Sequence, residues 1–295
     1  VRKELPWIPT DFDEPFMQQA HVETLKTRFE KAVDVGLCER VLVAGDPGMG
    51  KTRLAREFMS SVDFIPKYVF LADGHDDGAG PFVLFRNLLK SRYDIPPEMD
   101  PVDAGQQLFS EIVALHDAPE PEMDAHLIGF LLGMSIPGSP FAKVRSEEKE
   151  GLRFRAMQAL CRVLARDARN RALLFIVDEY HLASPSSRNL ISHIYRSLQG
   201  HPVWIMALAR PETLEQHPEL TEAEHHFDLK TLKRSEMERL VRSLLTGVES
   251  VPDDVLGRVL KTADGNPYAA YHVLLYLHEM GVIERDGDRW SVDET

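Results

Sequence analysis

Residues 45–52 constrain this chain more strongly than any other stretch of its sequence. They read GDPGMGKT and satisfy the pattern GxxxxGK[ST] at every fixed position, between the apolar run 41–44 and a helix-forming stretch at 53–60. Glycines let the backbone curl so that successive N–H groups point inward at phosphate oxygens, and the N-terminus of the following helix adds positive potential. The flanking strand and helix favour a phosphate-binding loop over a chance match to the pattern.

The side chains of this loop predict which part of a nucleotide each would contact. Lys51 is expected to reach the β- and γ-phosphates, and Thr52 is expected to place its hydroxyl on Mg²⁺. The predicted ligand is therefore ATP or ADP with Mg²⁺. The predicted nucleotide-binding residues are Gly45, Asp46, Pro47, Gly48, Met49, Gly50, Lys51, Thr52 and Arg53.

The composition is typical of a soluble globular protein with one large or two modest domains. Among 295 residues, 34 are basic and 47 acidic, which gives a net charge of −13. Because an acidic chain without a local basic patch lacks the electrostatic footprint for nucleic acid, we expect no direct binding to it. Two distant cysteines, no membrane-length apolar run and no signal peptide predict a cytoplasmic setting without a membrane. The chain starts at Val1, so we expect a piece of a longer protein.

Apolar runs predict a parallel sheet with helices between its strands. The run 41–44, the phosphate loop with its helix, and a second run at 67–72 form a βαβ unit. The apolar residues 173–177 predict a buried strand, another strand is expected at 203–208, and a short one is expected near 226–229. The stretch 73–172 is predicted to be a helical insertion, with helices near 82–93, 104–116, 125–134 and 147–167.

After Lys230 the pattern changes to helices alone. Ser235 and Glu238 have the spacing of a capping box, and further helices are predicted near 253–262 and 268–280. The final stretch, 282–292, has an Asp-Gly turn between two short runs and predicts a β-hairpin.

An acidic pair follows the buried run 173–177. Asp178 and Glu179 are expected at the carboxyl end of a parallel strand, at the sheet edge where the phosphate loop also lies. There Asp178 would bind Mg²⁺ directly or through water, and Glu179 would polarise the water that attacks the γ-phosphate. The purely structural alternative is that the two acidic residues cap the N-terminus of the next helix. The presence of a phosphate loop in the same chain favours the catalytic interpretation.

Three arginines and one turn are weaker candidates. Arg210 leaves the next strand at the same edge and would contact the γ-phosphate, or would simply pair with Glu212 on the surface. Arg188 and Arg196 lie on the helix after the acidic pair, where one of them could serve the nucleotide site of a neighbouring subunit in trans, although a solvated helix face is the more ordinary interpretation. Residues 265–267, Gly-Asn-Pro, are either a turn between two helices or a lid motif that meets the nucleotide through Pro267.

Four segments together resemble the ATPase module of the STAND class, which are AAA+-related signal-transduction ATPases found in large bacterial regulators. The segments are GDPGMGKT, LLFIVDEYHLASPSSRNLISHIYRSL, VWIMALARPE and GNPYAAYHVLLYLHEMGVIERDGDRW. The resemblance runs from about Phe16 to Val292. It implies Lys51 and Thr52 as phosphate and magnesium residues, Asp178 and Glu179 as the acidic pair, Arg210 as a sensor and residues 265–267 as the lid motif.

The same resemblance implies an α/β, three-layer P-loop NTPase fold with about five parallel strands, a helical lid and the start of a winged-helix piece. The implied boundaries are 1–230 for the core with its insertion at about 73–172, 231–280 for the lid and 281–295 for the hairpin. One departure stands out: the family usually carries a hydrophobic-Gly-Arg-Glu motif beside the adenine, and this chain reads Phe16-Met17-Gln18-Gln19-Ala20.

Three functions remain open from the sequence. The first is a regulatory ATP switch with slow hydrolysis, which acts on an attached effector, a protein partner or a nucleotide-dependent homo-oligomer. The second is a pseudo-ATPase that keeps the fold as a protein-interaction module, which the altered motif at 18–20 favours slightly. The third is a DExH-type ATPase stimulated by nucleic acid, suggested by residues 178–181, although such motors need a second motor domain and a basic track.

Overall fold

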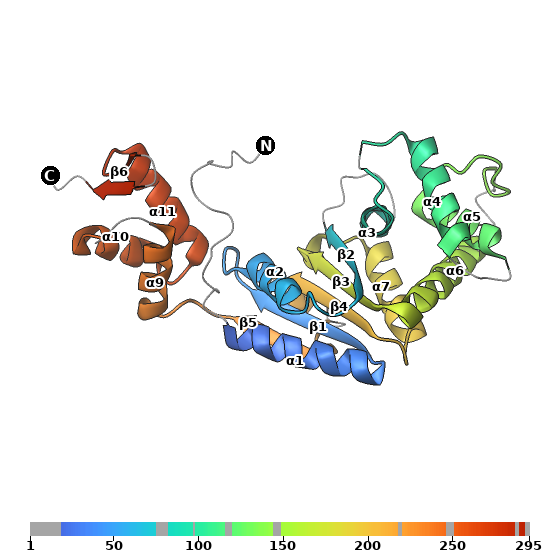
Figure 1. Cartoon of the computed structure of the whole chain (residues 1–295), viewed down its shortest axis with the longest axis horizontal. Coiled ribbons are helices and arrows are strands. Elements are labelled where there is room, and N and C mark those ends of the chain that lie inside the picture. The colour runs from blue at the N-terminus through green and yellow to red at the C-terminus, as the bar shows by residue number, and fades with distance from the viewer. Residues whose placement is uncertain are drawn as a thin grey trace. The chain divides into compact units, whose positions relative to one another are not determined.

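The computed structural model describes residues 19–74, 82–96, 98–115, 120–143, 149–217, 220–245, 251–286 and 289–292. Strands alternate with helices up to residue 229, and helices with a terminal hairpin follow (Figure 1). The chain divides into two compact units. One combines the described residues of Val1–Lys26, Ala44–Ser61 and Asp228–Thr295, and the other comprises Thr27–Val43 and Val62–Phe227.

A five-stranded parallel sheet carries its strands in the order β2-β3-β4-β1-β5. In the register of the central pairs, Lys67 lies opposite Ala172 on β3, and Leu173 lies opposite Val203 on β4. This arrangement confirms the predicted parallel α/β fold and all five predicted strands. Their bounds are β1 Cys38–Gly45, β2 Lys67–Asp73, β3 Ala172–Asp178, β4 Val203–Ala209 and β5 His225–Leu229.

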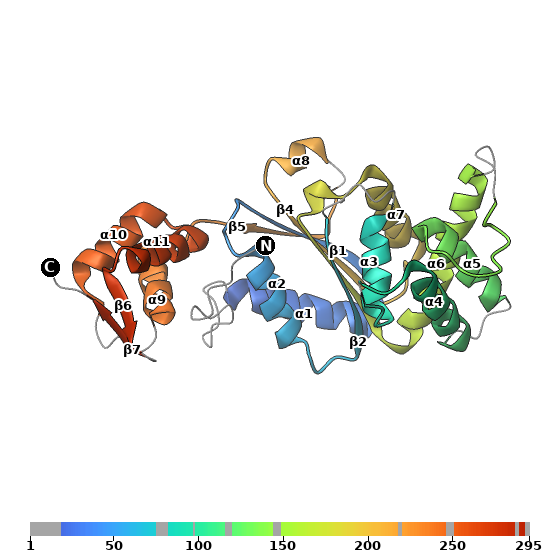
Figure 2. The ribbon, with the colours of Figure 1, turned by 90° about the horizontal axis from the view of Figure 1, so that it is seen from above.

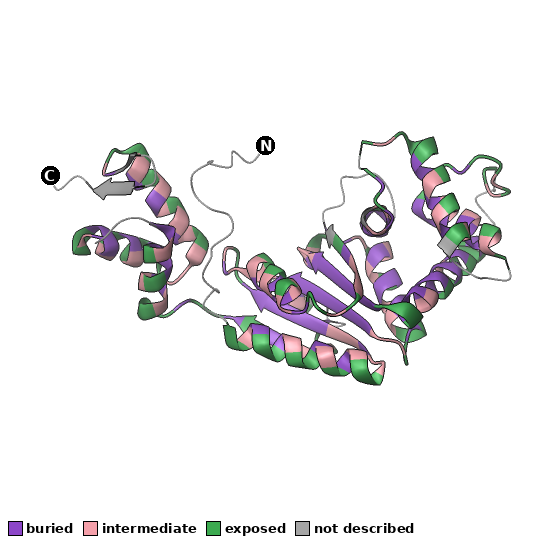
Figure 3. Cartoon of the chain, in the orientation of Figure 1, coloured by how far each residue is buried: buried purple, intermediate pink, exposed green. Residues whose placement is uncertain are grey.

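Apolar side chains explain why the central strands lie inside the molecule. Every residue of β4 is buried, and β3 is buried until its last residue, Asp178 (Figure 3). The indole of Trp204 on β4 packs edge-on against the ring of Phe29 with 5.6 Å between centroids. Phe70 on β2 stacks on Phe175 on β3 at 4.3 Å. Continuous apolar runs of this kind are typical of strands that are covered on both faces.

The stretch between β2 and β3 is helical, as predicted. α5 and α6 pack together around a buried carboxylate, since Asp124 is 4% exposed and forms ion pairs with Arg162 and Arg166 of α6. A buried charge is tolerated when it is paired in this way. The four helices are α3 Val83–Arg92, α4 Pro101–Leu115, α5 Pro121–Leu132 and α6 Lys149–Asn170.

Among the remaining helices of the first 230 residues, α1 precedes β1 and the others connect strands. Ser184 caps α7, because its hydroxyl oxygen accepts a hydrogen bond from the N–H of Ser187 at 3.2 Å, and Pro185 follows at the first helical position. These elements are α1 Gln19–Val35, α2 Lys51–Ser61, the 3₁₀ helix η2 Tyr180–Leu182, α7 Pro185–Ser197 and α8 Thr213–Gln216.

The C-terminal region forms a small bundle with its own core (Figure 2). Val241 of α9 and Val259 of α10 are fully buried in that core together with Ile283. The predicted helices and antiparallel hairpin are confirmed; the predicted Asp-Gly turn extends to Gly287, which lies outside the described residues. The elements are α9 Arg234–Leu244, α10 Asp253–Ala263, α11 Pro267–Glu279, β6 Ile283–Asp286 and β7 Arg289–Val292.

The predicted capping box at Ser235 and Glu238 is wrong by two residues. Helix α9 begins at Arg234, and the carboxylate of Glu236 accepts a hydrogen bond from the backbone N–H of Lys233 at 2.7 Å. Glu236 lies three residues after Lys233, but a Lys side chain cannot accept a hydrogen bond, so only the Glu236 half of a capping box forms.

Candidate nucleotide site

The phosphate loop follows β1 and leads directly into α2. Gly48 and Gly50 have φ angles of +83° and +90°, which are backbone conformations that favour glycine. The N–H of Met49 donates to the carbonyl of Asp46 at 3.3 Å and closes a turn, while the Met49 side chain is buried and anchors the loop. The sequence pattern thus produces a curled backbone at the place where it predicts one.

Lys51 lies over this loop at the first position of α2. Its ammonium group donates hydrogen bonds to the carbonyls of Gly45 at 2.7 Å and Asp46 at 3.1 Å. Thr52 is exposed, and the guanidinium of Arg53 is bound to Glu57 one turn later at 2.7 Å. The first N–H groups of a helix have no acceptor inside the helix, so the N-terminus of α2 offers donors to an anion.

The acidic pair ends β3 in an unusual backbone conformation. Asp178 is half-buried, and its carboxylate accepts a hydrogen bond from the N–H of Glu179 at 2.9 Å. Glu179 has a φ of +45°, in the left-handed region, before the 3₁₀ helix begins at Tyr180. Strained backbone of this kind is often found at functional positions, which makes the turn consistent with the predicted role.

Gly74 supports this turn, and the sequence interpretation did not single it out. Its N–H donates to the carbonyl of Asp178 at 2.7 Å, and a Cβ at this position would lie 2.4 Å from the carbonyl oxygen of Glu179. Only a residue without a side chain permits such an approach. The sequence signal that could have indicated this contact is a glycine two residues after the apolar run 67–72.

The arginine candidates have different surroundings. Arg210 is half-buried at the end of β4, where its carbonyl accepts a hydrogen bond from the N–H of Thr213 at 3.0 Å. Arg188 donates to the carbonyl of Ala183, just before its own helix. Arg196 donates to the carbonyl of Ser192 at 3.1 Å within α7. These two hydrogen bonds, from Arg188 and from Arg196, are local.

Residues 264–267 form the predicted turn between two helices. Asp264 ends α10 at a φ of +44°, Gly265 follows at +77°, and Pro267 is the first residue of α11. Asn266 caps α11, because its side-chain oxygen accepts hydrogen bonds from Tyr268 and Ala269. The same turn contacts the phosphate loop: the Asn266 amide donates to the carbonyl of Pro47 at 3.0 Å. Asn266 lay within the predicted lid motif, but only Pro267 was assigned a contact there, although an Asn before a Pro is a recognisable cap.

The predicted site residues are thus distributed over both compact units. The phosphate loop and the turn at 264–267 belong to one unit, whereas Asp178, Glu179 and Arg210 belong to the other. In the sheet, β4 lies between β3 and β1, and each predicted segment follows the carboxyl end of its strand.

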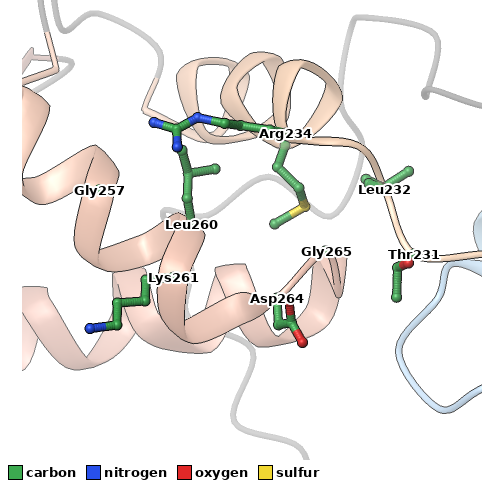
Figure 4. Close-up of a pocket in the computed structure, with 9 residues that line it drawn as sticks. Thr231, Leu232, Arg234, Gly257, Leu260, Lys261, Asp264 and Gly265 are labelled. Atoms are coloured by element: carbon green, nitrogen blue, oxygen red, sulfur yellow. The ribbon is translucent and has the colours of Figure 1, made fainter.

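A separate pocket of about 550 Å³ lies in the C-terminal bundle (Figure 4). Its lining combines apolar side chains with the charged side chains of Arg234, Lys261 and Asp264. None of the predicted nucleotide-binding residues lines it. The lining residues are Thr231, Leu232, Arg234, Met237, Gly257, Leu260, Lys261, Asp264 and Gly265.

The described side chains contain no group of three or more His, Cys, Asp or Glu residues arranged to hold a metal ion. Magnesium in nucleotide sites commonly takes one or two protein oxygens, phosphate oxygens and water, so Thr52 and Asp178 stay predicted ligands that would not form such a group. Among the helices in the described ranges, none has the length and hydrophobicity needed to span a membrane.

Comparison with protein families gives a decisive match over the region just described. The AAA ATPase domain family matches residues 14–206, a range that includes the phosphate loop and the acidic pair, ends within β4, and leaves out Arg210 and the turn at 264–267. The chain belongs to this family. It is a P-loop AAA+ module, and its curled loop, Lys51 and parallel sheet are the features that this membership explains.

Solved structures of AAA+ proteins share the fold at low sequence identity. The ORC1 protein of Aeropyrum pernix in complex with DNA has a TM-score of 0.54 at 14% identity, over 96% of this chain and 64% of that one. The ORC2 protein of the same organism, in ADPNP-ADP complexes, has a TM-score of 0.51 at 16% identity, over 99% of this chain and 68% of that one. Cdc6p of Pyrobaculum aerophilum has a TM-score of 0.55 at 11% identity, over 94% of this chain and 65% of that one.

A curated relative is the uncharacterized protein R02095 of Rhizobium meliloti (strain 1021). It is 27% identical over 175 residues, which cover 58% of this chain and 16% of the relative. The match therefore spans about a sixth of the relative's length.

Proposed function

We propose that this AAA ATPase domain is an ATP-binding, slowly hydrolysing regulatory switch of the STAND type. The observation that carries the proposal is the phosphate loop, with its glycines at positive φ, Lys51 across its carbonyls and α11 hydrogen-bonded to it. A ligand that contacts this loop shifts the position of the attached helices if it binds one arrangement more tightly than another.

Each site residue has a specific task in this proposal. Lys51 contacts the β- and γ-phosphates, Thr52 and Asp178 hold Mg²⁺, and Glu179 polarises the attacking water. Arg210 contacts the γ-phosphate and reports its presence. The order of the parallel strands supports assigning these residues to one nucleotide, because the carboxyl ends of such strands open onto one edge.

The proposal extends to the organisation of the protein. Residues 1–230 form the nucleotide core with an insertion at about 73–172, residues 231–280 form a lid, and 281–295 begin a winged-helix piece. Its outputs are an attached effector, a protein partner or a homo-oligomer, in a cytoplasmic setting. The larger size of the Rhizobium relative supports a module that works inside a longer chain.

The experiment compares the nucleotide content of the purified protein with that of Lys51→Ala. The protein is denatured, the released small molecules are separated, and Mg·ATP binding and phosphate release are then measured. The switch proposal is supported if the wild type retains ADP or binds Mg·ATP tightly and releases phosphate slowly. Lys51→Ala should then lose the retained or bound nucleotide. A wild type that neither retains nor binds nucleotide would refute it.

A second candidate is the pseudo-ATPase, which the departure from the family motif at residues 16–20 favours. Residues 16–18 lie outside the described residues, and Gln19 and Ala20 begin α1. A module of this kind mediates protein interactions and either binds nucleotide structurally, without turnover, or does not bind it at all. Equal phosphate release by the wild type and Glu179→Gln would favour this candidate.

A third candidate, ATPase activity coupled to nucleic acid, takes its support from the likeness to ORC1 in complex with DNA. The net charge of −13 argues against strong backbone binding, since phosphate contacts require clustered Lys and Arg. The test is ATP turnover with and without double- and single-stranded DNA at low salt. Stimulation that disappears in Lys51→Ala would establish this candidate.

A further inference from the structure

The side chain of Asn266 makes two kinds of contact at once. Its oxygen accepts hydrogen bonds from the N–H groups of Tyr268 at 3.0 Å and Ala269 at 3.1 Å, which caps α11. Its nitrogen donates to the carbonyl of Pro47 at 3.0 Å, across 219 positions of sequence. The first contact concerns one helix, whereas the second joins that helix to the phosphate loop.

A second hydrogen bond accompanies it. The N–H of Tyr268 also approaches the carbonyl of Gly48 at 3.3 Å. A Cβ on Gly48 would lie 2.6 Å from the Cβ of Tyr268 and 2.7 Å from the side-chain oxygen of Asn266. Gly48 therefore serves two purposes: it adopts a positive φ, and it leaves room for the N-terminus of α11.

These contacts restrict the direction of the loop's own donors. A trans peptide is planar, so its carbonyl and the N–H of the next residue point in opposite directions. When the carbonyls of Pro47 and Gly48 face α11, the N–H groups of Gly48 and Met49 must face away from it, and the Met49 N–H then closes the turn onto the carbonyl of Asp46. Inward-pointing N–H groups are what a phosphate loop needs in order to receive an anion.

We propose that Asn266 is a positioning residue of the nucleotide site, which latches α11 to the outer side of the phosphate loop and holds the loop in its phosphate-receiving conformation. The inference rests on the proposed function, because it assigns the loop to nucleotide phosphates. By linkage, a nucleotide that needs this loop conformation also tightens the contact between the loop and α11.

Helix capping alone does not account for the contact to Pro47. Ser184 caps α7 in the same sequence context, before a proline. Its hydroxyl oxygen accepts a hydrogen bond from the N–H of Ser187 and the same hydroxyl donates to the hydroxyl of Ser187, so both hydrogen bonds stay within that cap. Serine and asparagine cap helices about equally well, whereas only the asparagine carries an amide donor at this reach. Asn266→Ser therefore separates the two roles.

The experiment compares the Kd of Mg·ATP for the wild type, Asn266→Ser and Lys51→Ala. The matched control is Glu236→Ala, which removes a cap from α9 in the same bundle without altering a residue in contact with the loop. We expect Asn266→Ser to bind Mg·ATP about 3- to 10-fold more weakly, the range for one lost hydrogen bond, while its thermal midpoint without nucleotide stays near that of the wild type. Glu236→Ala is expected to lower the thermal midpoint and keep the wild-type Kd.

Hydrogen exchange provides a second measurement, which reports on the contact between the loop and α11 directly. We expect Mg·ATP to slow the exchange of the Tyr268 amide in the wild type and to have less effect in Asn266→Ser. Wild-type or tighter Mg·ATP affinity in Asn266→Ser would contradict the proposed role of Asn266 but not the proposed function. The same holds if Mg·ATP leaves the exchange rate of the Tyr268 amide unchanged in the wild type. A wild type that binds no Mg·ATP, or binds it equally well after Lys51→Ala, would overturn the proposed function and the latch with it.

Discussion

The phosphate loop and the acidic end of β3 are both turns after a parallel strand, yet they are constructed differently. The loop is shaped by glycines, by the Lys51 ammonium and by two hydrogen bonds from the start of α11. The acidic turn carries its chemistry on two carboxylates, and Gly74 approaches its backbone closely from behind. One region therefore presents backbone donors, and the other presents side-chain acceptors.

This difference predicts that the two regions fail in different ways. Backbone donors bind an anion whether or not it is hydrolysed, so damage to the loop should appear in nucleotide affinity. Carboxylates hold a metal ion and activate water, so damage to the acidic turn should appear in turnover. Substitutions in each region separate the two effects.

The largest effect is expected from Glu179→Gln. Loss of the base that polarises water should lower phosphate release about 10²- to 10⁴-fold, while the Kd of Mg·ATP stays within a few-fold of the wild type. Single-turnover phosphate release and equilibrium binding measure the two quantities. Glu212→Gln is the matched control, because Glu212 follows the neighbouring strand β4 and is exposed. Equal loss in both variants would contradict a specific role for Glu179.

Lys51→Ala should produce the opposite result. Removal of a charge-assisted contact to phosphate should weaken Mg·ATP binding about 10- to 100-fold. The control is Lys67→Ala, since Lys67 also donates to a backbone carbonyl, that of Val62 at 2.7 Å, but lies on β2. An affinity loss shared by both variants would show that the effect comes from general destabilisation.

Gly48→Ala tests whether the loop works through its backbone. The added Cβ would lie 2.6 Å from the Cβ of Tyr268, and the residue would have to keep a φ of +83°. We expect a cost of about 1–2 kcal/mol in the free energy of unfolding and weaker Mg·ATP binding. Chemical denaturation and binding titrations measure both. An unchanged affinity would contradict the importance of the contact with α11.

Gly74→Ala is the corresponding change behind the acidic turn. Its Cβ would lie 2.4 Å from the carbonyl of Glu179, so the turn must move, at a cost of about 1–3 kcal/mol in unfolding free energy. Because this shift displaces Glu179, we expect slower phosphate release with little change in Mg·ATP affinity. A variant that binds more weakly yet turns over normally would reverse the assignment of the two regions.

Sequence patterns predicted the two regions unequally. The strands and the phosphate loop were predictable because apolar runs and glycine spacing act over a few neighbouring residues. The helix cap at Asn266 was equally local, but its bond to Pro47 depends on how α11 meets a loop 219 positions away, and no local pattern contains that information. The φ of Glu179 likewise follows from packing against Gly74 rather than from its own neighbours.

The smallest expected effect concerns the two cysteines, which lie outside both regions. Burial, followed by the charge of Glu224, raises the pKa of Cys38 on β1 to about 12, and burial raises the pKa of Cys161 on α6 to about 11. Since the thiolate is the reactive form, both thiols should label slowly with a thiol reagent from pH 7 to 9, and unfolding should release them. In the four variants above, both thiols should label as slowly as in the wild type if each substitution changes only its own site region. Rapid labelling in one of them would show that its functional defect reflects loss of the sheet or of α6 rather than damage to one site region.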